Sequence, residues 1–420
     1  MNVTTEDHPV ARVERCLGPI AGLVTELSFR QSDRSMGEFA ITELRTAAVD
    51  GSILGADGES IDLTVGGGGE TVSEATLTSL AEFLERYSMY WPVEGRRIAT
   101  HAELCEDDEA VVDLAPLTAW DKQALARAGF EPVEEDTPVE WVRGTGLATG
   151  RDVHIPADMV AFTPGEEGGR FPSSTSGNAC GSSLAGALTR SLYEQVERDA
   201  VMRTWYQGTI PERLDISTCE ELAQFRRRIT PDGYQLHVLD LPTPTDCWAI
   251  GTVLVNEVDR VPKFRLFAGA HRTLAGALRD ALTETAEGLL QTKYRLAAGD
   301  MPDEDIDIES VYNFDDNVQY YMRPAQFQRV AHLADGDLRT VDCKATTPDL
   351  DLDRALAAVG AGNETTPIAV DLTPPDVREL GMYTTAVYVP ELVDMALPGL
   401  PPVDHPALSH VETTAPHPFP

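Results

Sequence analysis

One octapeptide occurs twice in this chain. Residues 79–86 read SLAEFLER and residues 191–198 read SLYEQVER, 112 residues further on. Five positions are identical: Ser79/Ser191, Leu80/Leu192, Glu82/Glu194, Glu85/Glu197 and Arg86/Arg198. Internal repetition indicates an architecture built from duplicated units. We therefore expect two related halves that enclose a single site.

A third, weaker copy follows in ALTETAEG, residues 281–288, which keeps Leu282, Glu284 and Glu287. Apolar residues recur at helical spacing around the first two copies, so we expect all three to lie in helices. The glycine-rich GGGGETVSE before the first copy offers Thr71 and Ser73 as helix caps. Each helix therefore presents two glutamates three residues apart on one face.

Alternating apolar runs between these helices predict strands. They are VEWVRGTGLATGRDVHI, YQLHVLDL, CWAIGTVLV, TPIAVDLT and MYTTAVYV, and FRLFAGAHRTLAGALRD reads as strand, loop and helix. Interleaved helices and strands predict an α+β (mixed α/β) fold. We expect an N-terminal extension at 1–15, one catalytic domain of duplicated halves at 16–397, and a proline-rich tail at 398–420.

The composition excludes several classes of protein. The chain has 420 residues with 69 Asp+Glu against 33 Lys+Arg, a formal net charge of −36. Such a surface repels nucleic acid and anionic membranes, so neither is expected as a partner. No apolar run is long enough to cross a bilayer, and the acidic N-terminus does not resemble a signal peptide. We expect a cytoplasmic protein whose acidic surface suits a high-salt, halophile-like cell.

Familiar catalytic motifs are absent. The six cysteines contain no CxxC pair, which argues against zinc sites and a disulfide framework and favours buried thiols. No GxxxxGK[ST] loop or GxSxG elbow occurs. GTGLATG at 144–150 imitates a dinucleotide loop, but the strand-like RDVHIP follows it where a helix is required. We expect no dinucleotide site there.

The glutamate pairs of the three predicted helices point to a metal and a nucleotide. Six converging carboxylates repel one another unless cations hold them. Carboxylate and phosphate oxygens are the hard ligands that Mg²⁺ prefers. Arg86 and Arg198, adjacent to their glutamates, have the planar fork that binds phosphate. The pattern predicts a nucleoside triphosphate held through Mg²⁺ by acidic helices.

These motifs and their order resemble the YcaO family of ATP-dependent enzymes. SxxExxER, then SSTSGNACG leading into SLYEQVERDA, then ALTETAE carry the resemblance. It extends to CLGPIAGLVTEL, WVRGTGLATGRDVHIPADMV and DLTPPDVRELGMYTTAVYVPEL, and covers roughly residues 16–395. Two departures stand out: Thr175-Ser176-Gly177 replaces the usual Ser-Asn-Gly, and Glu287 stands where glutamine is common.

The resemblance implies roles for individual residues. It assigns the Mg²⁺ ligands to Glu82, Glu85, Glu194, Glu197 and Glu287. It places the nucleotide among these glutamates and a further set of residues. That set is Ser79, Arg86, Thr175, Ser176, Arg198 and Glu284.

The chain's last residues, Pro416-His417-Pro418-Phe419-Pro420, form a PxPxP ending. Alternate prolines stiffen a strand, which then loses little entropy when it docks. In YcaO enzymes this ending accompanies azoline formation. The resemblance makes the Pro420 carboxylate a candidate base, positioned by Pro418 and Pro416.

The resemblance therefore implies an ATP-dependent cyclodehydratase that forms azolines from Cys, Ser or Thr of a ribosomally synthesised precursor peptide. Bacteriocin-like peptide maturation is the setting we expect. A thioamide-forming enzyme and a non-catalytic partner subunit are the alternatives. No leader-binding module is evident, so we expect a separate E1-like partner protein, and the family implies a homodimer.

Overall fold

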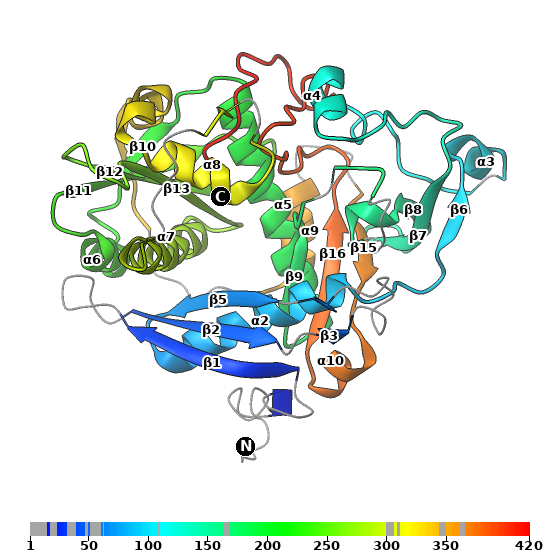
Figure 1. Ribbon diagram of the computed structural model, residues 1–420, viewed down its shortest axis with the longest axis horizontal. Coiled ribbons are helices and arrows are strands. Elements are labelled where there is room, and N and C mark those ends of the chain that lie inside the picture. Colours follow the sequence, from blue (N-terminus) through cyan, green and yellow to red (C-terminus); the bar gives the residue numbers. More distant parts are fainter. Residues whose placement is uncertain are drawn as a thin grey trace.

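The computed structural model describes most of the chain (Figure 1). The described residues are 15–16, 23–31, 39–46, 49–50, 60–61, 63–107, 109–162, 169–172, 174–299, 306–308, 311–343, 350–360 and 366–420. Residues 1–14 of the predicted N-terminal extension lie outside these ranges. No helix in the described part is long and apolar enough to cross a membrane.

The strands form three sheets and a two-stranded ribbon within the described ranges. The first sheet joins β1 (Val24–Gln31), β2 (Ala40–Thr46) and β5 (Thr64–Gly69). The second has the order β13 (Phe264–His271), β12 (Trp248–Asn256), β11 (Tyr234–Leu241), β10 (Glu212–Asp215), β14 (Leu338–Thr340). The third has the order β6 (Arg97–Ala99), β7 (Val139–Gly146), β15 (Ile368–Asp371), β16 (Tyr383–Tyr388), β9 (Asn178–Gly181), with β8 (Asp152–Pro156) paired to β7. The ribbon pairs β3 (Val49–Asp50) with β4 (Ser60–Ile61).

Three long helices carry the repeated motifs: α2 (Val72–Met89), α5 (Leu184–Tyr206) and α7 (Leu274–Ala297). Shorter helices and turns complete the fold. They are α3 (His101–Glu106), α4 (Lys122–Arg127), η3 (Ala157–Met159), α6 (Glu220–Ile229), α8 (Phe314–Met322), η5 (Pro324–Arg329), η6 (Ala331–Ala334), α9 (Leu352–Gly360) and α10 (Pro375–Glu379). The predicted mixture of helices and sheets is confirmed.

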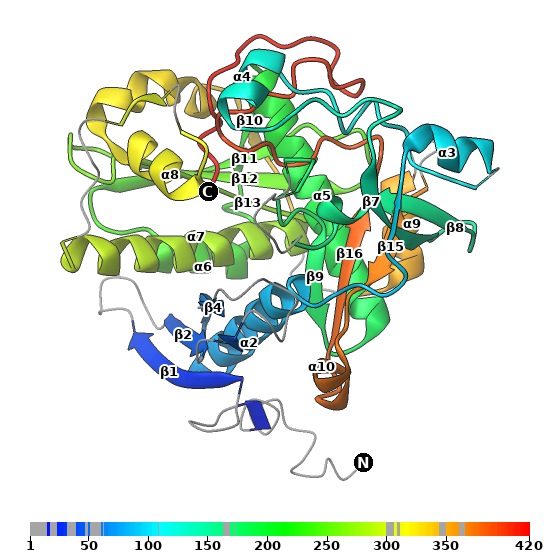
Figure 2. The ribbon, with the colours of Figure 1, turned by 45° about the vertical axis from the view of Figure 1, so that its right-hand side comes forward.

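Helix α5 occupies the centre of the molecule (Figures 1 and 2). Its buried residues, such as Val196 and Val201, share one apolar core with Val253 of the second sheet and Val387 of the third. Helices α6 and α7 cover the other face of the second sheet, where Leu222 and Leu278 share a separate core with strand residues of that sheet. The second sheet therefore lies between α5 on one face and α6 with α7 on the other.

A strand–helix unit occurs three times, as β5–α2, β9–α5 and β13–α7. In each unit a hydroxyl residue caps the helix, with Thr71, Ser183 and Thr273 accepting a backbone N–H at the third helical position. This satisfies an otherwise unpaired donor at the helix start. Helices α5 and α7 also both begin with LAGAL, at 184–188 and 274–278. The third copy is therefore closer to the second than the octapeptide alone indicates.

Glycine allows each strand to approach its helix closely. A Cβ added at Gly67 in β5 would lie 2.2 Å from the backbone nitrogen of Ser79, and one at Gly269 in β13 would lie 2.4 Å from that of Ala281. Real Cβ atoms do not approach backbone so closely, so the helix would have to move. The two glycines therefore allow the short packing distance between each strand and its helix, β5 with α2 and β13 with α7.

We expect Gly67→Ala to destabilise the protein by about 3 kcal/mol, because the clash is with helix backbone and no side chain can rotate away. Gly360→Ala at the end of α9 is the control, since an added Cβ there meets nothing within 4 Å. Thermal and denaturant unfolding of both variants measure the difference. Equal stability of the two would show that β5 and α2 do not pack as described.

The cysteines differ from the sequence prediction at one place. Cys219, at the start of α6, and Cys343, just after β14, form a disulfide across 124 residues of sequence, although no disulfide was expected. Spacing alone could not reveal this, because the pairing of β14 with β10 brings the two residues together. Cys16, Cys180 and Cys247 are buried free thiols as predicted, whereas Cys105 is exposed.

Candidate functional site

The repeated motifs meet at one cavity of about 610 Å³. Its wall combines residues of α2, α5 and α7 with the β5 strand and the end of β9. The site residues from the sequence analysis that line it are Glu82, Glu85, Arg86, Glu194, Arg198, Glu284 and Glu287. We call this hollow the acidic cavity. It contains carboxylates from all three copies of the motif.

The first two copies have the same internal geometry. In α2, the Arg86 guanidinium lies 2.8 Å from a Glu82 oxygen and 3.2 Å from a Glu85 oxygen. In α5, Arg198 lies 3.0 Å from Glu194 and 3.3 Å from Glu197. Each arginine thus neutralises part of the charge of its own glutamate pair. The two octapeptides that repeat in the sequence therefore also form the same ion pairs in the structure.

Burial raises the pKa values of four carboxyl groups in the cavity wall. It brings the pKa of Glu194 to about 7 and that of Glu287 to about 7. The pKa of Glu85 lies well above its usual range, through burial and then through the neighbouring charge of Glu82. Burial and the charge of Glu287 do the same to the pKa of Glu284. A bound cation would relieve this mutual repulsion, since it favours the ionised carboxylates.

The third copy contributes charge without an arginine. Gly288 stands where the other copies have arginine, and a Cβ at Gly288 would lie 2.1 Å from the Phe267 ring of β13. A carboxylate oxygen of Glu287 accepts a hydrogen bond from the Gln291 amide at 3.3 Å, and the Gly68 backbone N–H opposes the rise in its pKa. The α7 side of the cavity is therefore the side with the least compensated negative charge.

Ser79 does not line the acidic cavity. Its hydroxyl is buried against β2, 2.8 Å from the Thr42 carbonyl oxygen. Ser191 is placed in the same way, 2.9 Å from the Thr385 hydroxyl of β16. The repeated serine therefore packs helix against sheet, and the α2 hydroxyl residue in the cavity wall is its neighbour Thr78.

Thr175 and Ser176 also lie outside the cavity wall. The buried Ser176 hydroxyl lies 2.7 Å from that of Ser174 and accepts the Met395 N–H at 3.2 Å. Ser176 thus holds the segment after β16 in place through a hydrogen bond. Glu197, the remaining residue of the predicted set, is paired with Arg198 and is not part of the cavity wall.

Sequence reasoning missed four polar wall residues: Thr64, Thr78, Arg190 and Gln291. Helical spacing could have found the last three. Thr78 and Arg190 each lie four residues before a motif glutamate, and Gln291 lies four residues after Glu287, so each shares its glutamate's face.

The C-terminal tail lies beside α8 (Figures 1 and 2). The Asn317 amide donates to the His417 carbonyl at 2.6 Å, and the Tyr321 hydroxyl donates to the Pro416 carbonyl. The buried Phe419 ring lies beneath the guanidinium of Arg198, 4.9 Å from its carbon to the ring centroid. The tail therefore contacts an arginine of the cavity wall.

Acid should weaken tail docking. His417 is buried and its Nε2 lies 2.8 Å from the Ala396 carbonyl oxygen. Burial, with a contribution from the Arg198 charge, lowers the pKa of His417 to about 4, and burial lowers that of His405 to about 4. Both histidines are therefore neutral when docked. The docked state is unaffected above their usual pKa of about 6.5 and loses stability progressively as the pH falls towards 4.

The fluorescence of Trp205 can follow this change, because its indole N–H donates to the Ala415 carbonyl of the tail at 2.8 Å. We expect His417→Gln to reduce the loss between pH 6.5 and 4, and combination with His405→Gln to remove most of it. An identical pH profile in wild type and the double variant would contradict this account.

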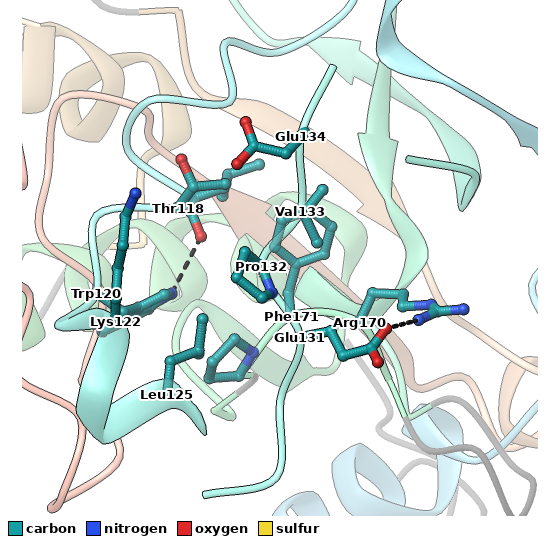
Figure 3. Close-up of a pocket in the computed structure, with 12 residues that line it drawn as sticks. Thr118, Trp120, Lys122, Leu125, Glu131, Pro132, Val133, Glu134, Arg170 and Phe171 are labelled. Carbon is teal, nitrogen blue, oxygen red and sulfur yellow. Dashed lines mark hydrogen bonds and ion pairs between the residues drawn. The ribbon is translucent and has the colours of Figure 1, made fainter. Parts of the chain in front are cut away.

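A second hollow, of about 160 Å³, lies beside α4 (Figure 3). Trp120 and Phe171 form part of its apolar wall, and Arg170 pairs with Glu131 at 3.5 Å on its rim. It contains none of the residues that the repeat analysis selected. We therefore place the candidate site in the acidic cavity.

Comparison with known families identifies the family of the chain. The family model described as YcaO cyclodehydratase, ATP- and Mg²⁺-binding, matches residues 66–393. The chain therefore belongs to the YcaO family, and the expected cofactors, ATP and Mg²⁺, are confirmed.

Two curated relatives share part of the sequence. An uncharacterized protein of Methanothermobacter thermautotrophicus is 25% identical over 227 residues, which are 53% of this chain and 56% of the relative. An uncharacterized protein in the tfuA 3′ region of Rhizobium leguminosarum bv. trifolii is 29% identical over 217 residues, 48% of each chain. The chain spans about half the length of the curated relatives it matches.

Solved structures share the fold. A heterocyclase in complex with substrate and cofactor has a TM-score of 0.72 at 20% identity, covering 99% of this chain and 57% of that one. YcaO from Methanopyrus kandleri bound with AMPPCP and Mg²⁺ has a TM-score of 0.61 at 22% identity, covering 87% and 85%. The E. coli microcin synthetase McbBCD complex has a TM-score of 0.64 at 15% identity, covering 94% and 96%. The predicted YcaO-type fold is confirmed.

Proposed function

We propose that this protein is an ATP-dependent cyclodehydratase that forms azolines in a ribosomally synthesised peptide. The observation that carries the proposal is the acidic cavity: three copies of one motif converge on it in a chain of the YcaO family. In the proposed reaction, a Cys, Ser or Thr side chain attacks the preceding amide carbonyl. ATP then phosphorylates the former amide oxygen, and phosphate leaves as the ring closes.

The carboxylates of the cavity suit a hard cation. Within the described ranges, no three metal-ligating side chains surround a single point. An ion would therefore be held jointly by protein carboxylates and nucleotide oxygens, as Mg²⁺ commonly is. The proposed protein ligands are Glu82, Glu85, Glu194 and Glu287 of the cavity wall, together with Glu197, which adjoins the wall through its pair with Arg198. Bound Mg²⁺ would neutralise charge on the phosphates during transfer.

Protein groups supply the rest of the chemistry. Arg86 and Arg198 already lie between carboxylates at the cavity and are positioned to bind phosphate oxygens. The tail is proposed to act on the acceptor, with Pro418 and Pro416 positioning the Pro420 carboxylate as a base. Seating of Phe419 on Arg198 is the structural support for placing the tail near the chemistry.

Partners and setting are part of the proposal. We propose a cytoplasmic homodimer that receives its precursor peptide from a separate E1-like protein. The net charge of −36 favours assays in molar potassium chloride, because screening reduces self-repulsion of so acidic a surface.

Mass spectrometry of a precursor peptide incubated with the protein, its partner and ATP·Mg²⁺ tests the function. We expect each ring to remove one water from the peptide and to release one ADP and one phosphate. Replacement of oxygen by sulfur when sulfide is present would instead identify thioamide formation. An unmodified peptide with no ATP turnover, despite the added partner, would favour a non-catalytic subunit.

A further inference from the structure

Three arginines line the acidic cavity, and one of them is not engaged by the motif glutamates. Arg86 and Arg198 each pair with two glutamates of their own helix. Arg190 lies one turn before Glu194 on α5, and among the described residues no carboxylate lies within ion-pair distance of its guanidinium. Its side chain is exposed and opens onto the cavity. Its charge opposes the rise in the pKa of the buried Asp280 carboxyl on α7, but the two groups form no ion pair. The guanidinium therefore remains available to an incoming anion.

Another hollow, of about 310 Å³, adjoins the acidic cavity at Arg190. We call it the annex. The two hollows share Thr78, Ala81, Cys180 and Arg190. The rest of the annex wall is mostly apolar. Arg190 thus lies where the charged lining of the acidic cavity meets the mostly apolar lining of the annex. The annex is therefore suited to an uncharged group.

We propose that Arg190 binds the terminal phosphate of the nucleotide and that the annex receives the residue of the acceptor peptide next to the reacting amide. This inference rests on the proposed function. In the transfer, the bond from the terminal phosphorus to the bridging oxygen breaks and ADP leaves with its electron pair. A new bond joins that phosphorus to the former amide oxygen. The acceptor must therefore lie at the phosphate end of the nucleotide, where Arg190 and the annex meet.

The geometry favours this orientation over the reverse one. A triphosphate carries its largest charge at its terminal phosphate, and a guanidinium that is not ion-paired with a carboxylate binds it without first breaking an ion pair. The peptide residue beside an amide is uncharged along its backbone, and the apolar walls of the annex exclude water from it. In this orientation the nucleoside would lie against the part of the acidic cavity wall that β5 forms.

Arg190→Ala tests the first half of the proposal. Calorimetry compares ATP·Mg²⁺ with ADP·Mg²⁺ for wild type, Arg190→Ala, Arg190→Lys and the control Arg354→Ala on α9. We expect Arg190→Ala to weaken ATP binding about tenfold or more and ADP binding less than about twofold, with partial recovery in Arg190→Lys. Equal weakening of both nucleotides, or no weakening, overturns the assignment. Absence of ATP binding in wild type would instead refute the proposed function.

Gly186→Leu tests the second half. A Cβ at Gly186 would meet only the Ser183 hydroxyl oxygen at 3.0 Å and a Leu350 methyl at 3.7 Å, so a larger side chain can extend into the annex. The probe is N-acetyl-leucyl-cysteine amide, observed by saturation-transfer NMR in the presence of AMPPCP·Mg²⁺. We expect wild type and the control Gly360→Leu to transfer saturation to the probe.

We expect Gly186→Leu to lose that transfer while it keeps wild-type affinity for ATP and ADP. Transfer that survives in Gly186→Leu overturns the annex assignment. Loss of ATP and ADP affinity in the same variant would show that the annex holds the nucleoside, which also overturns it.

Discussion

Glu194→Gln combined with Glu197→Gln should abolish measurable binding of ATP·Mg²⁺, with an affinity loss of about 100-fold or more, roughly 2.8 kcal/mol. Both carboxylates stand on α5 and pair with Arg198, and Glu194 lines the acidic cavity. Their removal takes two proposed ligands from the cation and leaves Arg198 without its ion pairs. Isothermal titration calorimetry measures the loss.

Two controls separate lost binding from lost structure. Glu134→Gln with Glu135→Gln removes the same charge from exposed residues of a surface loop and should leave affinity unchanged. Glu287→Gln removes a proposed ligand that has no arginine partner in its motif. It should therefore weaken ATP·Mg²⁺ binding without leaving a buried guanidinium unpaired. Wild-type affinity in both cavity variants, with folding intact, would refute the account.

Phe419→Ala should both destabilise the protein and weaken nucleotide binding. The ring is buried, so truncation should cost about 3 kcal/mol of unfolding free energy. Loss of the ring beneath Arg198 also removes a cation–π contact and frees the guanidinium to move. We expect ATP·Mg²⁺ affinity to fall about tenfold, which corresponds to ~1.4 kcal/mol.

Phe29→Ala provides the matched control, because this phenylalanine of β1 is 57% exposed. It should change neither stability nor affinity appreciably. Deletion of residues 416–420 should reproduce the loss of affinity seen in Phe419→Ala and add to the loss of stability. A deletion variant with wild-type affinity for nucleotide would show that the tail does not support Arg198.

Much of the fold could be predicted because it follows from short-range patterns. The strand at 234–241 and the hairpin at 139–156 follow apolar alternation, and Thr71 caps α2 as expected, with Glu74 completing the capping box. Helical spacing likewise placed the motif glutamates on common faces. The strand predicted after residues 144–150 is present, since β7 and β8 form a hairpin there.

The failures have a common physical cause. Whether Ser79 or Thr78 reaches the cavity depends on Thr42, which is 37 residues away on another strand. The disulfide of Cys219 depends on a partner 124 residues away. The buried hydrogen bond of the Ser176 hydroxyl depends on the backbone N–H of Met395, 219 residues away. Each outcome depends on tertiary contacts that local sequence patterns do not contain.

The central claim is that the repeated acidic helices bind a nucleotide only together with a cation. Titration of wild-type protein with AMPPCP, in the presence and absence of Mg²⁺, tests it most directly. Because buried, mutually repelling carboxylates line the cavity, we predict binding with Mg²⁺ and a loss of at least about 100-fold without it. Equal binding with and without Mg²⁺, or no binding in either case, would contradict the account.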